Sequence, residues 1–104
     1  MSLTSNLEKM LDQGQDNAML RFGLGSAYFN DKAFAEAVPH LRACLTQDAT
    51  YTAAYKLLGK ALFKLGESAE AKAVFAKGLP IAREKGDKQT EREILAFQKK
   101  ITRM

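Results

Sequence analysis

The sequence repeats itself at a fixed offset. The dipeptide Leu58-Gly59 repeats Leu24-Gly25, and we call the distance from Leu24 to Leu58 the repeat offset. The other identical pairs at this offset are Ala27 and Ala61, Phe29 and Phe63, Ala35 and Ala69, Glu36 and Glu70, Ala37 and Ala71, and Leu45 and Leu79. A fixed period of this length indicates a repeat architecture, in which each unit buries its apolar face against the next. We therefore expect residues 1–104 to form one domain of stacked, similar units.

Apolar residues recur at helical spacing along most of the chain, and Gly and Asp residues interrupt the pattern. The pattern predicts helices over about 3–13, 17–30, 33–47, 52–65, 68–85 and 88–102. Pro39 lies inside the third of these, so we expect a bend there or a later start. Gly66 is expected to end the fourth as a left-handed C-cap. The fold class is therefore all-α.

The predicted helices divide the chain into units. Repeat one spans 18–51 and repeat two spans 52–85. Leu7 and Leu11 lie one repeat offset before Leu41 and Leu45, so the segment 3–13 is interpreted as the second helix of a truncated preceding repeat. The segment 88–102 carries Ile94 among basic residues and is interpreted as a polar capping helix.

Several classes of function have no support in the sequence. Glu8 and Lys9 interrupt the N-terminal segment where an export signal needs an apolar core, and no run of about 18 apolar residues occurs, so a cytoplasmic protein is expected. His40 and Cys44 are spaced as one helical turn, but two ligands do not make a metal site, and we interpret them as a satisfied His beside a buried Cys. No nucleophile and base set or phosphate loop is present. We expect no enzyme activity, cofactor or metal.

The repeat resembles the tetratricopeptide repeat, a helix-turn-helix unit of about 34 residues with Leu-Gly, Ala and aromatic residues at set positions. In this sequence the signature departs from the family at Arg21, which replaces a bulky first residue, and at Cys44 and Gly78, which replace a later Ala. The matching residues are Leu24, Gly25, Ala27, Tyr28, Ala37, Leu41 and Leu45 in repeat one and Tyr55, Leu58, Gly59, Ala61, Ala71, Phe75 and Leu79 in repeat two. The resemblance implies a right-handed solenoid of antiparallel helical hairpins.

The same resemblance implies that the first helices of successive repeats line a concave groove that binds a peptide. The residues placed there are Met19, Phe22, Ser26, Phe29, Asn30, Lys56, Lys60, Phe63 and Lys64. Independently of the family, Lys56, Lys60 and Lys64 recur every fourth residue and form a basic stripe without an acidic partner in their own helix. Two plainer interpretations stay open: the stripe is a solvated helix face, and Phe22, Phe29 and Phe63 belong to the core.

Charge is distributed unevenly along the chain. Residues 1–52 hold four Lys or Arg against six Asp or Glu, a balance of −2, whereas residues 53–104 hold twelve against six, a balance of +6. A basic half can attract an acidic peptide, a nucleic acid or an anionic membrane. Together with the groove that the resemblance implies, it favours a protein-interaction scaffold that binds an acidic peptide segment of another protein, and no membrane partner is expected. Two alternatives remain: RNA binding by the basic half, and weak self-association through the ends of the short array.

Overall fold

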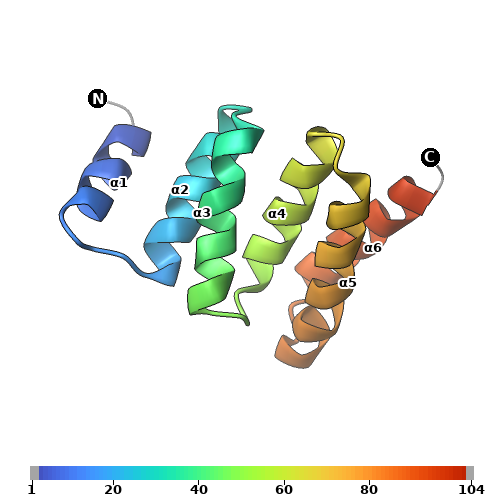
Figure 1. The fold of residues 1–104 in the computed structure, drawn as a ribbon. Helices are drawn as coiled ribbons and strands as arrows, with labels where there is room; N and C mark the ends of the chain where they lie inside the picture. Colours follow the sequence, from blue (N-terminus) through green and yellow to red (C-terminus); the bar gives the residue numbers. More distant parts are fainter. Residues whose placement is uncertain (1–2, 103–104) are drawn as a thin grey trace.

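The computed structural model describes residues 3–102, which form six α-helices joined by short turns. The helices follow one another across an elongated body of 42 × 28 × 19 Å, with the N- and C-terminal ends on opposite sides (Figure 1). They are α1 (Leu3–Asp12), α2 (Ala18–Asn30), α3 (Phe34–Gln47), α4 (Thr52–Lys64), α5 (Ser68–Lys85) and α6 (Lys88–Thr102). The predicted all-α fold of stacked helical hairpins is confirmed, and the helix boundaries lie within about one or two residues of those predicted.

Turn chemistry sets where the helices begin and end. The Asn17 side chain accepts a hydrogen bond of 2.8 Å from the Leu20 N–H and caps α2. Gly66 follows α4 with a φ of +83°, as predicted for a left-handed C-cap residue. Lys32 takes the corresponding place after α2, one repeat offset earlier, with a φ of +62°. A lysine therefore holds a conformation that glycine adopts more readily.

Of the two effects expected of Pro39, a bend or a later start, the later start does not occur, because α3 begins at Phe34. A proline at this position leaves the carbonyl of Ala35 without its helical partner. Ala35 is exposed, so this part of α3 lies on the solvent side, where a carbonyl without a helical partner costs least. Pro80 lies inside α5 in the same way and is also exposed.

The core lies between paired helices, where small residues let the backbones approach closely. A β-carbon added to Gly25 of α2 would lie 2.6 Å from Leu41 of α3, and one added to Gly59 of α4 would lie 2.3 Å from the Phe75 ring of α5. Leu41 and Phe75 are both fully buried. The repeated Leu-Gly dipeptide thus creates the space into which a large residue of the second helix packs.

The last helix is held beside α4 by its capping residue. Asp87 accepts hydrogen bonds from the Thr90 N–H at 3.1 Å and from the Thr52 hydroxyl at 2.6 Å. These bonds join the start of α6 to the start of α4, and they hold the Asp87 pKa below its usual value. Ile94 and Ile101 of α6 are buried in the common core. In this position α6 is equivalent to the first helix of a third unit.

Among residues 3–102, no helix is both long and apolar enough to cross a bilayer.

Candidate peptide-binding surface

The first helix of each unit, α2, α4 or α6, contacts the first helix of the next, so the three form one side of the molecule. We call the accessible side chains of these helices the first-helix face. All nine residues predicted to line a groove are on α2 or α4. Met19 is 75% exposed, Asn30 and Lys64 are exposed, and the other six predicted residues are half-buried.

The basic stripe has an acidic partner on α6. The Lys56 ammonium lies 2.9 Å from a carboxylate oxygen of Glu93, and the Lys60 ammonium lies 3.7 Å from the other oxygen. The hydrogen bond from Lys56 holds the Glu93 pKa below its usual value. One carboxylate therefore offsets part of the charge of two lysines. Lys64 is the exposed member of the stripe, and no contact of its side chain with Glu93 is seen within the described chain.

Beyond Glu93 along the first-helix face, two phenylalanines meet two lysines. The rings of Phe63 and Phe97 pack edge to face with centroids 6.0 Å apart. The Lys60 ammonium lies 5.2 Å from the centre of the Phe97 ring, and the Lys100 ammonium lies 5.5 Å from that of Phe63 and 5.6 Å from that of Phe97. We call Lys60, Phe63, Phe97 and Lys100 the cation-aromatic cluster. It presents positive charge beside apolar rings at one place.

On α2 the predicted aromatic residues are partly used in packing. Phe22 stacks on Tyr51 with ring centroids 4.9 Å apart, and Phe29 packs edge to face on Phe34 at 5.2 Å. Phe22, Phe29 and Phe63 are all half-buried and border the core. These rings are therefore neither fully in the core nor fully free, since each packs against the core and keeps an accessible part.

A hollow of about 440 Å³ lies on the other side of the molecule, between α3 and α5. Leu45, Val74 and Lys77 line its walls, and Leu58 of α4 is at its floor. Arg42 at its edge is paired with Glu70 across the two helices, with 2.6 Å between nitrogen and oxygen. This hollow was not among the predicted sites.

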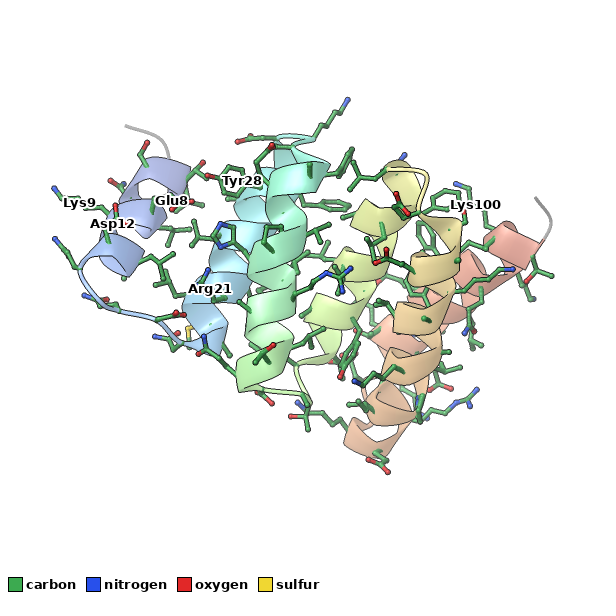
Figure 2. The ribbon with its side chains drawn as sticks, viewed as in Figure 1. Glu8, Lys9, Asp12, Arg21, Tyr28 and Lys100 are labelled. Carbon is green, nitrogen blue, oxygen red and sulfur yellow. The ribbon has the colours of Figure 1, made fainter. Side chains whose placement is uncertain are left out.

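His40 lies in a polar cluster between α1, α2 and α3. Its ring contacts the Arg21 guanidinium at 3.1 Å and the Glu8 carboxylate at 3.5 Å, and burial lowers the His40 pKa. The Tyr28 hydroxyl donates to Glu8 at 2.9 Å, and Figure 2 shows these two side chains meeting between α1 and α2. Cys44 is fully buried, which raises the pKa of its thiol to about 11. Its thiol is protonated at neutral pH and unreactive.

Arg21, which departs from the repeat signature, has an electrostatic role instead of an apolar one. Its guanidinium makes two bonds of 2.9 Å to the carboxylate of Asp16 in the turn before α2. This pairing and a bond from Gln47 lower the Asp16 pKa to about 2. The pair ties the turn to the helix that follows it.

Comparison with known protein families agrees with this geometry of paired helices. The tetratricopeptide repeat family matches residues 28–88. The chain belongs to the tetratricopeptide repeat (TPR) family. A TPR repeat-containing protein of Pseudomonas aeruginosa is 45% identical over 101 residues, which cover 97% of this chain and 96% of the relative. Members of the TPR family generally bind other proteins and lack enzyme activity, so membership indicates a protein-interaction scaffold.

Solved structures share the TPR fold. A protein of Bordetella parapertussis, solved in solution, is 43% identical with a TM-score of 0.86, over 99% of this chain and 90% of that protein. A tetratricopeptide repeat domain protein of Salinibacter ruber has a TM-score of 0.79 at 21% identity, over 86% of this chain and 99% of that protein. The second likeness concerns the fold alone.

Sequence reasoning missed the contribution of α6 to the first-helix face of this TPR chain. It treated 88–102 as a cap, so Glu93, Phe97 and Lys100 were not considered. Phe97 follows Phe63 by one repeat offset, as Phe63 follows Phe29, but α6 starts two residues later than this offset from the start of α4, so the offset alone did not identify α6 as a first helix. Carried one step further, the repeat offset reaches the ring that packs on Phe63.

Proposed function

We propose that this chain is a non-enzymatic scaffold that binds an acidic, partly apolar peptide segment of another cytoplasmic protein on its first-helix face. The observation that carries the proposal is the cation-aromatic cluster. Lys60 and Lys100 flank two half-exposed rings, and exposed Lys64 lies on the same helix as Lys60. A carboxylate and an adjacent apolar side chain on one peptide would both find partners there.

Within the first-helix face, the cluster is a better binding centre than Lys56. The Lys56 ammonium already has a hydrogen-bonded carboxylate at 2.9 Å, and a ligand would have to displace it. Lys100 is exposed and rests over rings, which hold no negative charge. We therefore place the acidic residues of the peptide along Lys60, Lys64 and Lys100, with Met19, Phe22, Ser26, Phe29 and Asn30 extending the surface over α2.

Exposed charges contribute little free energy each, about 0.2–1 kcal/mol per pair, and are screened within about 8 Å at physiological salt. Affinity in the micromolar range or weaker is therefore expected. Specificity would come from the rings, because an apolar contact is far less sensitive to salt.

The proposal is tested by titrating a peptide of alternating Glu and Phe residues and a matched peptide with Gln in place of Glu. Lys100→Glu and Lys64→Glu should each weaken binding of the acidic peptide several-fold, and Lys77→Glu, a charge reversal beside the α3 and α5 hollow, should leave it within about twofold. Equal affinity of wild type for the two peptides would contradict the proposal. Binding of an RNA oligonucleotide as tight as that of the acidic peptide would instead favour the nucleic-acid alternative.

A further inference from the structure

The two ends of the array are structurally incomplete in complementary ways. Within residues 3–102, α1 is a second helix with no first helix packed before it, and α6 is a first helix with no second helix packed after it. The two lie at opposite ends of the elongated body (Figure 1). Each end therefore lacks the kind of helix that the other end presents.

The uncovered side of α1 is recognised from the repeat spacing. Leu3, Leu7 and Met10 lie one repeat offset before Ala37, Leu41 and Cys44, which are fully buried where α3 packs on α2. In α1 two of these three places are open, because Leu3 is 64% exposed and Met10 is 38% exposed, whereas Leu7 packs toward Gly23 of α2. No residue of α1 is fully buried. Leu3 and Met10 are thus left uncovered where the next unit completes a hairpin.

The matching side of α6 contains a shallow hollow of about 380 Å³, lined by Leu95, Gln98, Lys99 and Thr102. Leu95 is the eighth residue of α6, and Gly59 is the eighth residue of α4. Gly59 faces Phe75 of the paired helix α5, so Leu95 lies at the matching place on α6. The hollow therefore lies where a second helix would pack against α6. Its floor is apolar at Leu95 and its rim is basic at Lys99.

Charge favours contact between unlike ends. Helix α1 carries Glu8, Lys9 and Asp12, a balance of −1, whereas α6 carries a balance of +2 from Lys88, Arg92, Lys99 and Lys100 against Glu91 and Glu93. Figure 2 shows Lys9 and Asp12 on α1 at one end of the molecule, and Lys100 on the opposite side of the molecule. Two basic ends repel each other, whereas an acidic end attracts a basic one.

We propose that a second copy of this chain docks head to tail, with its α1 seated in the Leu95 hollow of α6 so that the two helices form a hairpin across the contact. Leu3 and Met10 of one copy cover Leu95 of the other, and Asp12 approaches Lys99. The contact joins two different surfaces, so each copy keeps one free end and the assembly grows beyond a dimer. Because few apolar side chains take part, association is weak and rises with protein concentration.

The assembly does not depend on peptide binding, because its contact surfaces are at the ends of the array. Sedimentation velocity of wild type over a concentration series from about 10 µM to 1 mM should show a rising weight-average mass that passes the dimer. Met10→Glu alone and Leu95→Glu alone should each remain monomeric. A mixture of the two variants should form dimers and nothing larger, because one keeps an intact α6 end and the other an intact α1 end.

Lys99→Glu provides a second variant of the α6 end, since this exposed residue can change without disturbing the core. It should reduce association at least several-fold, and Leu65→Glu, which alters an exposed leucine away from both ends, should associate as wild type does. A wild type that stays monomeric to 1 mM would overturn the proposal. So would a Met10→Glu and Leu95→Glu mixture without dimers, or a loss of association caused by variants of one end only, which would indicate a symmetric dimer.

Discussion

Two glycines of the same helix should respond in opposite ways to the same substitution. Gly23 and Gly25 both lie inside α2, where replacing Gly by Ala favours the helix by about 0.8–1.0 kcal/mol. A β-carbon at Gly23 would meet its nearest neighbour, a methyl group of Leu7, at an ordinary distance of 3.6 Å. A β-carbon at Gly25 would lie 2.6 Å from both Cγ and Cδ2 of fully buried Leu41.

Leu41 cannot move its Cγ without shifting its whole side chain, and its backbone nitrogen lies only 3.4 Å from the added carbon. Overpacking of this kind costs about 1–3 kcal/mol. Gly23→Ala should therefore stabilise the protein by up to about 1 kcal/mol, and Gly25→Ala should destabilise it by about 0–2 kcal/mol after the helical gain is included.

Thermal unfolding followed by circular dichroism measures the difference, because 1 kcal/mol shifts Tm by about 4–8 °C in a domain of this size. Urea unfolding of the same variants gives the free energies directly. If Gly25→Ala proved as stabilising as Gly23→Ala, the close approach of α2 and α3 would not be what fixes glycine in the repeated dipeptide.

Three further outcomes are expected. Lys32→Gly should stabilise the protein by about 0.5–1 kcal/mol in urea unfolding, because it removes a lysine from a left-handed backbone conformation, and Gly66→Lys should destabilise it. Changes in stability of the same sign in both variants would contradict this explanation. The lowered Asp87 pKa means that its bonds contribute stability above about pH 4, which is lost as the pH falls through the folded-state pKa, so Asp87→Asn should flatten acid unfolding measured below pH 5. Glu93→Gln should raise affinity for an acidic peptide several-fold by calorimetry, because it removes the carboxylate that competes for the lysines, and unchanged affinity would count against the site.

The helices and their pairing were predictable because they follow from local signals. Apolar periodicity and the repeated Leu-Gly dipeptide act over one or two turns of helix, and the structure places Gly25 against Leu41 and Gly59 against Phe75 in the same way. Pro39 was harder to judge, since a proline is tolerated in α3 only where the freed carbonyl reaches water, and exposure is a tertiary property.

The composition of the first-helix face was only partly predictable. Lys56 and Lys60 were recognised as a stripe, but their partner Glu93 is distant in the sequence and is brought near by the packing of α6 on α4. That packing depends on a longer α5, which ends at Lys85, and on a turn that makes α6 start later than one repeat offset after the start of α4. Because this spacing is longer, comparing the sequence with itself at one repeat offset does not identify α6 as the start of a third unit.

Binding of an acidic peptide at the cation-aromatic cluster can be located by amide chemical-shift mapping during titration with the peptide of alternating Glu and Phe, in wild type and in Lys60→Glu. Binding at the cluster predicts shifts concentrated on α4 and α6 around Phe63 and Phe97, and their loss in Lys60→Glu. Shifts gathered around Leu45 and Lys77 in the opposite hollow, or an undiminished response of Lys60→Glu, would contradict it.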